Sequence, residues 1–246
     1  QAVSSNAPRR PVRDLRFFLT VPHACSYLPG KEATTLFLDP QESPVPGVYD
    51  SLSLLGFRRS GRHLYRPHCE GCNACRSVRI PVDEFSANRT QRKVWQRNHD
   101  IETRVIAARF DANHYALYAD YIRQRHADGD MYPPSREQYR TFLTLEEPYA
   151  HLMEMYLEGE LVAVAAFDQL EHGLSAIYTF FKVDEALDKR SLGTFAILKL
   201  IALCQEKQLP HLYLGYWIEE CRKMRYKQSF SPIELLDGRH WRPLIR

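Results

Sequence analysis

Three apolar segments joined by two short turns constrain the fold of this chain more than any other feature. Residues 151–157, 160–170 and 174–181 are rich in aliphatic and aromatic side chains, and Glu158-Gly159 and His172-Gly173 separate them. Apolar runs of this length, separated by short turns that contain glycine, are typical of β-hairpins. The sequence therefore predicts an antiparallel meander of three strands in the second half of the chain.

A helix and a fourth strand are predicted directly after the meander. Apolar residues recur at helical spacing from Phe195 to Leu203, and Ser191 stands where an N-cap is expected. The turn 191–194 carries backbone N–H groups that suit a phosphate or an oxyanion, although most N-caps only cap. An aromatic strand, 211–217, and a basic helical segment follow. The order strand, strand, strand, helix, strand, helix resembles the fold of the GCN5-related N-acetyltransferases.

The size and composition of the chain fit an α+β protein of one large or two modest domains. It has 246 residues, 44% of them hydrophobic and 26% charged. We expect residues 1–12 to be a flexible terminus, 13–100 an N-terminal cysteine-containing α/β domain and 101–246 a domain like that of the N-acetyltransferases. Helices are predicted at 111–125 and after Ser135. There is no apolar run near 18 residues and no signal-peptide pattern, so we expect a cytosolic protein.

Three cysteines in two consecutive C-x-x-C steps predict a metal centre. Cys69, Cys72 and Cys75 stand in the string HCEGCNACRS, and each step lets both sulfurs reach one ion. Cys25 is the expected fourth ligand and His68 the second choice. Thiolate sets suit zinc or an iron–sulfur cluster, and the spacing does not choose between them. The alternative is a set of free thiols that are open to oxidation.

Cations are bunched although the net charge is only +3. One run lies at 58–79, a second at 89–97 beside Trp95, and a third at 222–227, where no acid stands among the four cations. Bunched Arg and Lys with neighbouring aromatic residues suit a nucleic-acid backbone, whereas a solvated face is the usual explanation of any single run. Three runs favour nucleic-acid binding.

Four local strings resemble the arginyl-tRNA–protein transferase family. They are ACSYLPG at 24–30, LLGFRRSGRHLYRPHCEGCNACRSVRIPV at 54–82, SLGTFAILKLIAL at 191–203 and LYLGYWIEECRKMRYKQSFSPIELL at 212–236. Within the family the resemblance is to its short bacterial branch, the aspartate/glutamate leucyltransferases. The longer members carry paired adjacent cysteines where this sequence has the 69, 72, 75 spacing, which bears on the metal site and not on the reaction.

The resemblance implies transfer of leucine from leucyl-tRNA to the N-terminal α-amine of proteins that begin with Asp or Glu, which marks them for degradation through the N-degron pathway. Aminoacyl-tRNA is then the co-substrate, with no nucleotide cofactor and no membrane partner. Because the ester is already activated, the enzyme must mainly hold an amine against a carbonyl and stabilise an oxyanion. An α-amine has a pKa near 8, so only a weak base is required.

Candidate residues for each step come from these strings, from the strands of the meander and from the basic run at 89–97. Catalytic candidates are Asp168, Tyr178, Ser191 and Tyr216, and Asp168, at the end of an apolar strand, is the candidate for binding or deprotonating the amine. Candidates for binding the acidic N-terminus are Arg76, Arg79, Lys223, Arg225, Tyr226 and Lys227. Candidates for tRNA phosphates are Arg58, Arg59, Arg89, Arg92, Lys93 and Arg97, with Trp95 as a stacking platform. The metal candidates remain Cys25, Cys69, Cys72 and Cys75. Each of these tyrosines and Asp168 also has an ordinary structural interpretation, in the core or at a strand end.

Three alternatives stay open on the sequence. An arginyl donor would use the same chemistry. A coenzyme A-dependent N-acetyltransferase is a different class, and the single glycine in SLGT weakens it because that fold normally has a glycine-rich turn there. A non-catalytic zinc protein that binds RNA is the third, supported by the basic runs and the cysteines.

Overall fold

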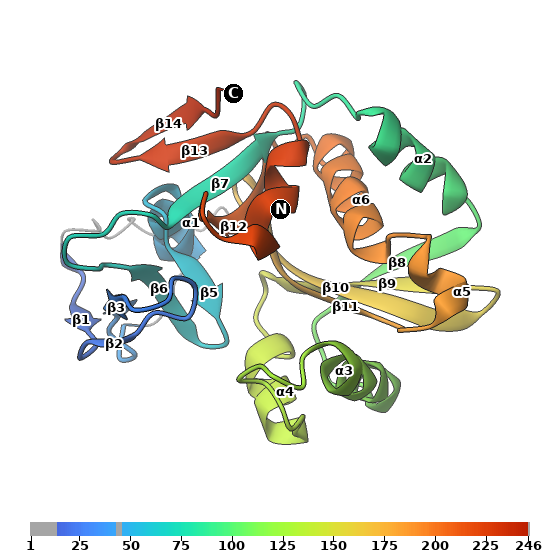
Figure 1. Cartoon of the computed structure of the whole chain (residues 1–246), viewed down its shortest axis with the longest axis horizontal. Coiled ribbons are helices and arrows are strands. Elements are labelled where there is room, and N and C mark those ends of the chain that lie inside the picture. The colour runs from blue at the N-terminus through green and yellow to red at the C-terminus, as the bar shows by residue number, and fades with distance from the viewer. Residues whose placement is uncertain (1–13, 43–45, 246) are drawn as a thin grey trace, which may run out of the picture.

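A mixed sheet of eight strands forms the centre of the molecule (Figure 1). The computed structural model describes residues 14–42 and 46–245, and the predicted flexible terminus at 1–12 lies outside them. In spatial order the strands are β14 (His240–Pro243), β13 (Glu234–Asp237), β7 (Arg76–Pro81), β12 (His211–Trp217), β11 (Gly173–Phe181), β10 (Glu160–Leu170), β9 (Ala150–Leu157) and β8 (Ile101–Ala107). β11 and β12 pair in parallel, and the other neighbours pair antiparallel.

Helices cover both faces of this sheet. In Figure 1, α2 (Arg89–Arg97) and α6 (Leu192–Glu206) lie on one face, and α3 (Ala112–Arg125) and α4 (Arg136–Leu143) lie on the other. The short helix α5 (Glu185–Asp188) precedes α6. A 3-10 helix, η2 (Arg222–Ser229), follows β12. The predicted meander is therefore confirmed as β9, β10 and β11, and α6, β12 and η2 follow it in the predicted order.

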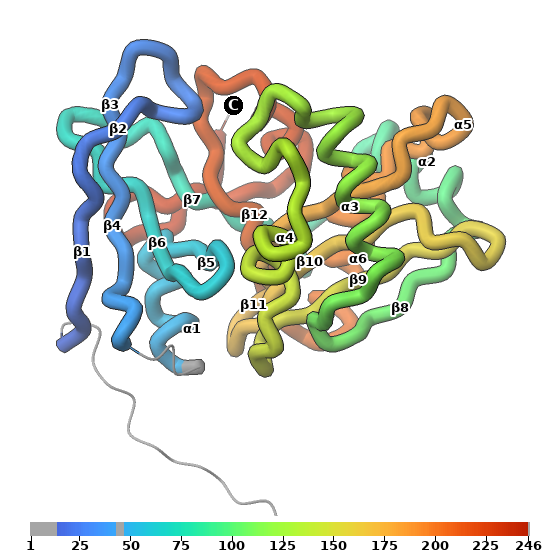
Figure 2. Tube along the Cα trace, turned by 90° about the horizontal axis from the view of Figure 1, so that it is seen from below, coloured from blue at the N-terminus to red at the C-terminus, as the bar shows by residue number. Residues whose placement is uncertain are grey.

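The N-terminal residues form a smaller sheet beside one end of the large one (Figure 2). Its strands, in spatial order, are β1 (Phe17–Leu19), β4 (Thr35–Leu38), β6 (His63–Pro67) and β5 (Arg58–Ser60). A two-stranded ladder of β2 (His23–Ala24) and β3 (Glu32–Ala33) carries the loop that contains Cys25, and α1 (Pro46–Leu54) packs on the small sheet. The small sheet shares a buried cluster with Leu170 of β10, which joins it to the large sheet.

One core spans the predicted boundary at residue 100. Val78 of β7 is fully buried with Leu174, Leu212 and Phe195, which come from β11, β12 and α6. Burying one such side chain stabilises the fold by roughly 1.5–3 kcal/mol. The cysteine-containing segment thus supplies an inner strand of the large sheet. The division into domains at 100 stays a prediction, and the structure shows that residues on both sides of it share a sheet.

Helix starts follow local chemistry except at α6. Asn88 and Gln91 form a capping box at α2, and the side chains of Asp111 and Ser135 accept backbone N–H groups at α3 and α4. Ser191 does occupy the N-cap position of α6, but its φ is 51° and its side chain makes no capping hydrogen bond. The predicted position of the helix start is therefore confirmed, although the Ser191 side chain does not cap it.

The large sheet opens between its two parallel strands. β11 and β12 are in register only at Gly173–Ser175 and His211–Tyr213, although β11 continues to Phe181 and β12 to Trp217. Beyond that point each strand pairs only with its other neighbour among the described residues. Gly215 has a φ of 79°, and the β12–β7 register shifts beside it. A left-handed glycine at this bulge lets β12 bend away from β11.

No helix in the described ranges is long and apolar enough to cross a membrane.

Candidate functional site

Arg58 of the small sheet fills the opening between β11 and β12. Its Nη2 donates a hydrogen bond to the carbonyl oxygen of Ala176 in β11. On the other side, a Cβ at Gly215 of β12 would overlap its guanidinium, so only glycine leaves the room it takes. The Nε of Arg58 is buried and has no hydrogen-bond partner among the described residues. A cation from the first quarter of the chain therefore stands between two strands of the second half.

Lys227 is a second cation at the same opening. It lies in η2 and is only 7% exposed, and its Nζ donates a hydrogen bond of 2.5 Å to the carbonyl oxygen of Tyr216. Burial and, secondarily, the charge of Arg58 lower the pKa of Lys227 to about 7, and Cys221 opposes them. Across the described part of the chain, no carboxylate forms an ion pair with Arg58 or Lys227. The opening thus holds two adjacent cations and no acid to neutralise them.

Aromatic side chains line the side of the opening next to α3. The ring centroids of Tyr121 and Phe181 lie 4.9 Å apart, and those of Tyr121 and Tyr178 lie 6.3 Å apart. The hydroxyl of Tyr178 is buried without a partner in the described structure, and burial raises its pKa. Tyr226 of η2 is half exposed and close enough to act electrostatically on Tyr121, whose pKa is raised mainly by burial. The result is an aromatic wall of Tyr121, Phe181 and Tyr178, with Tyr226 between it and Lys227.

Tyr216 points from β12 toward the small sheet. Its hydroxyl donates to the carbonyl oxygen of Gly56 at 2.7 Å and lies 3.2 Å from that of Tyr65. Burial raises its pKa well above the usual value. It lines a pocket of about 170 Å³ together with Arg66 and Arg76. Tyr216 therefore connects the small sheet, this pocket and the strand that borders the opening.

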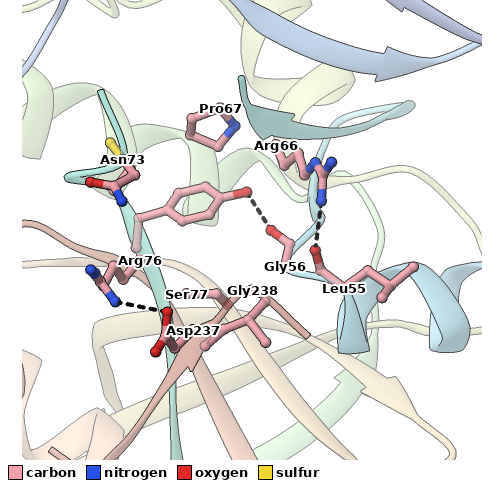
Figure 3. A pocket seen from close by; sticks show the side chains of 12 residues that line it. Leu55, Gly56, Arg66, Pro67, Asn73, Arg76, Ser77, Asp237 and Gly238 are labelled. Carbon is pink, nitrogen blue, oxygen red and sulfur yellow. Dashed lines mark hydrogen bonds and ion pairs between the residues drawn. The ribbon is translucent and has the colours of Figure 1, made fainter. Parts of the chain in front are cut away.

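Arg76 is the predicted carboxylate receptor that faces this pocket. Figure 3 shows it beside Asp237, and the closest atoms of the two side chains are 3.7 Å apart. Its side chain is one-third exposed, so this contact is loose and screened by water. Arg79 is different, because its Nε donates to Glu234 at 2.8 Å and its guanidinium lies 4.2 Å from the ring of Trp241. Arg79 already has a carboxylate partner.

Asp168 forms a closed ion pair with Arg59. Both oxygens of Asp168 accept hydrogen bonds of 2.7 Å from the guanidinium, and Tyr49 donates a further bond of 2.5 Å. Asp168 is 0% exposed. Arg59 also donates to the carbonyl oxygen of Gly61. Two residues that the sequence assigned to different tasks, amine binding and tRNA binding, therefore contact each other in the interior.

The other predicted cations are on exposed surfaces. Lys223 and Arg225 are exposed on η2. The predicted tRNA contacts on α2 are also exposed: Arg89, Arg92, Lys93 and Arg97. Beside them, the ring of Trp95 is partly exposed and lies between Phe195 and Lys199, which places it at the edge of the core. Helix α2 packs on α6, so this basic surface belongs to the same face of the sheet as the N-terminus of α6.

The four predicted metal ligands gather near Cys75 without forming a metal-holding group. Burial raises the pKa of Cys75 to about 12, and the thiols of Cys69, Cys25 and Cys72 raise it further. The Sγ of Cys25 accepts N–H groups from Tyr27 and Leu28. In the ranges that the structure describes, no three His, Cys, Asp or Glu side chains are arranged to hold an ion. Metal binding would require the thiols to lose their protons and close together.

The sequence did not predict the role of three residues at the opening. Tyr121 and Phe181 were expected only as parts of a helix and a strand, and Arg58 was expected to contact a tRNA phosphate. No local signal marks them, because the contacts of Arg58 are with Ala176 and Gly215, more than 100 residues away in sequence. Tyr178, Tyr216, Tyr226 and Lys227 were predicted, and the structure brings them to the two sides of this opening or its border.

Comparisons with known proteins agree with this geometry. Two family models match: arginine-tRNA-protein transferase, N terminus, over residues 23–93, and arginine-tRNA-protein transferase, C terminus, over 113–237. A protein of Chromohalobacter salexigens named aspartate/glutamate leucyltransferase is 69% identical over 99% of this chain and 98% of its own length. A protein of the same name from Marinobacter nauticus is 54% identical over 95% and 98%.

Among solved structures, FemX shares the fold. The match has a TM-score of 0.52 and covers 92% of this chain and 87% of FemX, at 10% identity.

Proposed function

The chain belongs to the arginine-tRNA-protein transferase family, and on that premise we propose that it transfers leucine from leucyl-tRNA to the N-terminal α-amine of proteins that begin with Asp or Glu. The high identity to proteins named aspartate/glutamate leucyltransferase over the full chain supports leucine as the donor. The modified protein then begins with leucine, which targets it for degradation. The substrates place the reaction in the cytosol.

The observation that carries the proposal is the opening between β11 and β12, with the cations Arg58 and Lys227 in it and the aromatic wall near it. The chemistry needs a place where an amine meets an ester carbonyl. The amine nitrogen forms the new C–N bond, the bond from the carbonyl carbon to the ribose oxygen breaks, and the proton lost by the amine ends on that ribose oxygen. Because the ester is already activated, holding the two reactants together in the right orientation supplies most of the rate enhancement.

The aromatic wall suits the donor side of the reaction. Leucine has an apolar side chain, which packs well against rings such as those of Tyr121 and Phe181. The buried and unpartnered hydroxyl of Tyr178 is a donor for the ester carbonyl or the oxyanion that develops on it. The N-terminus of α6, at Ser191, is a second candidate for the same charge. Tyr216 acts on the other border of the opening, where it links β12 to the small sheet.

Asp168 takes a positioning role in this proposal instead of the amine contact expected from the sequence. Its pair with Arg59 uses both carboxylate oxygens and fixes β5, the strand that carries Arg58 on the adjacent residue. The exposed cations of α2 are proposed to contact tRNA phosphates, since they lie on the open surface next to α6.

The cysteine cluster is proposed to hold zinc or an iron–sulfur cluster. The gathering of Cys25, Cys69 and Cys72 around Cys75 supports this, as do the N–H groups that point at the Cys25 sulfur. Such a group would supply a cross-link within the small N-terminal part, and no step of the transfer depends on it. Elemental analysis and an absorbance spectrum of the purified protein test this directly: zinc or iron in stoichiometric amount supports the proposal, and a metal-free active protein contradicts it.

The experiment for the main reaction offers the protein a peptide that begins with Asp and a mixture of aminoacyl-tRNAs, and follows the peptide by mass spectrometry. We expect one added leucine and no added arginine. The matched control is the same peptide with an acetylated N-terminus, which has no amine to react. Addition of arginine would show that the donor is arginyl-tRNA and not leucyl-tRNA, and no addition of either residue would contradict the proposal.

A further inference from the structure

We propose that Arg58 and Lys227 together are the receptor for the acidic side chain of the acceptor, and that Lys227 is the residue that distinguishes Asp and Glu from Asn and Gln. The inference rests on the proposed transfer to acidic N-termini and names the residues that recognise them. The sequence gave six candidates for binding the acidic N-terminus, Lys227 among them, and assigned Arg58 to tRNA binding.

The charge balance of the opening is the first argument. Lys227 is more than nine-tenths buried, and its only described hydrogen bond is to the carbonyl oxygen of Tyr216. Arg58 uses Nη2 for the carbonyl oxygen of Ala176 and has a buried Nε without a partner. The groups whose charges act on Lys227 are Arg58, which repels its proton, and Cys221, which attracts it. No described carboxylate pairs with either cation.

A buried ammonium beside a half-buried guanidinium, with no anion among the described residues, is costly, and this points to a ligand. A buried charge destabilises a protein by several kcal/mol unless an opposite charge or enough hydrogen bonds compensate it. Buried donors in native proteins nearly always have partners, so the unpartnered Nε of Arg58, near an ammonium with one described hydrogen bond and no counter-charge, is an exception that needs an explanation. A carboxylate entering here would neutralise one charge and accept from both side chains. The arrangement is that of a carboxylate site before its ligand arrives.

The burial of the site favours a side-chain carboxylate over an RNA phosphate. The phosphates of a tRNA lie along an extended backbone, and the exposed cations of α2 offer contacts of that kind. Lys227 instead lies behind the partly exposed ring of Tyr226, with its Nζ 6.0 Å from the ring centroid. A short side chain at the end of a peptide can enter such a site, whereas a polynucleotide backbone cannot follow it.

Selectivity for an acidic side chain follows because no carboxylate of the described residues neutralises Arg58 and Lys227. An Asn or Gln side chain has nearly the same shape as Asp or Glu, but it brings no negative charge. Binding it would bury the two cations further without neutralising them, so the neutral side chain is rejected by the cost of that burial. The other predicted receptors differ, because Arg79 has Glu234 and Arg76 has Asp237 beside it.

The test compares two acceptor peptides that differ only in an N-terminal Asp or Asn. The ratio of their kcat/KM values is measured with leucyl-tRNA for the wild type, for Lys227→Met, and for the control Lys207→Met at the exposed end of α6. A charged hydrogen bond is worth about 10- to 150-fold in binding. We expect the Asp/Asn ratio to fall at least about tenfold in Lys227→Met, with unchanged affinity for leucyl-tRNA, and to stay at the wild-type value in Lys207→Met.

An unchanged ratio in Lys227→Met would overturn the inference, and so would a loss confined to tRNA affinity, which would make the pair a phosphate site. Failure of the wild type to modify the Asp peptide would instead contradict the proposed function. A measurement on the wild type avoids any dependence on the variant's folding: reductive methylation of Lys227 by formaldehyde, with cyanoborohydride as the hydride donor that reduces the imine, followed by mass spectrometry. The Asp peptide should protect Lys227 and the Asn peptide should not; equal protection by both, or no reaction in the free protein, contradicts the receptor.

Discussion

Arg58 and Arg59 are adjacent in β5, yet they occupy opposite kinds of site. Successive residues of a strand point to opposite faces, so the two side chains enter different parts of the molecule. Arg59 pairs with the carboxylate of Asp168, which also accepts a hydrogen bond from the Tyr49 hydroxyl, so the two charges neutralise each other within the protein. Arg58 meets another cation, Lys227, and no acid among the described residues.

The comparison shows two uses of a cation: Arg59 stabilises the fold through an internal ion pair, and Arg58 is available to bind an anionic ligand. A closed buried pair specifies how two segments meet, and it is costly to break because the remaining partner is left uncompensated. An open pair of like charges stabilises nothing by itself and gains only when an anion arrives. A substitution at Asp168 should therefore mainly lower the free energy of unfolding, whereas a substitution at Lys227 should mainly change substrate selectivity.

Breaking the closed pair should have the largest effect on stability. Asp168→Asn leaves Arg59 buried without its counter-charge, and we expect a loss of about 3–5 kcal/mol in the free energy of unfolding, measured by urea titration. The control is Asp237→Asn, since its two partners, Arg76 and Arg242, are partly exposed and both pairs are loose; it should cost at most about 1 kcal/mol. Equal losses in the two variants would show that the Arg59 site is not closed as described.

Filling the space beside Arg58 should have the second-largest effect on the free energy of unfolding. Gly215→Ala places a methyl group against the Arg58 guanidinium and also strains a left-handed backbone. Gly238→Ala is the matched control, because it has a similar positive φ but nothing within 4 Å. Strain alone costs about 1–2 kcal/mol, and the overlap should add at least about 1 kcal/mol at Gly215, seen by urea titration.

The transfer rate should separate the two glycine variants more clearly than their stability does. Displacing Arg58 should reduce leucine transfer to an Asp-starting peptide in Gly215→Ala only. Equal activity in the two alanine variants would remove Arg58 from the site.

The open pair should make stability depend on pH in a way that Lys227→Met abolishes. Because the pKa of Lys227 in the folded protein is about 7, against 10.5 ordinarily, the unfolded chain binds more protons between these values. Stability therefore rises with pH in this window. From pH 7 to 9 the wild type should gain about 2 kcal/mol relative to Lys227→Met, by urea titration at each pH. A constant difference between the two proteins would show that Lys227 does not titrate there.

The exposed cations of α2 should give the smallest effect per residue and no change in acceptor selectivity. Lys93→Met removes one proposed phosphate contact, so tRNA affinity should fall a few-fold and the slope of log affinity against log salt should decrease by about 1. The Asp/Asn ratio should stay at the wild-type value. A change in that ratio would mean that the two surfaces are not separate.

Local patterns predicted the framework of the molecule. The glycine turns at 158–159 and 172–173 gave the meander, and Ser135 gave the start of α4. These signals act over a few residues, so they can be read from the sequence. Ser191 gave the start of α6 as well, but its left-handed φ and the lack of a side-chain capping bond could not be predicted from the local pattern.

The site was predicted only in part because its contacts are distant in sequence. Nothing in the string RRS at 58–60 tells which arginine meets an acid, since the answer depends on Asp168 and on an opening formed by Ala176 and Gly215. Asp168 was expected to bind an amine because it ends an apolar strand, and that position equally suits an internal ion pair. Lys227 and Tyr226 were predicted from their basic, aromatic string, without a way to rank them among the other candidates.

Proton uptake on acceptor binding tests the central claim most directly. Calorimetric titration of an Asp-starting peptide, without tRNA, in two pH 8 buffers of different ionisation enthalpy gives the number of protons taken up. Lys227 is mostly neutral at pH 8 in the free protein and must become charged against a carboxylate. We predict about half to one proton more in the wild type than in Lys227→Arg, whose cation does not titrate. Equal proton uptake in the two proteins would contradict the account.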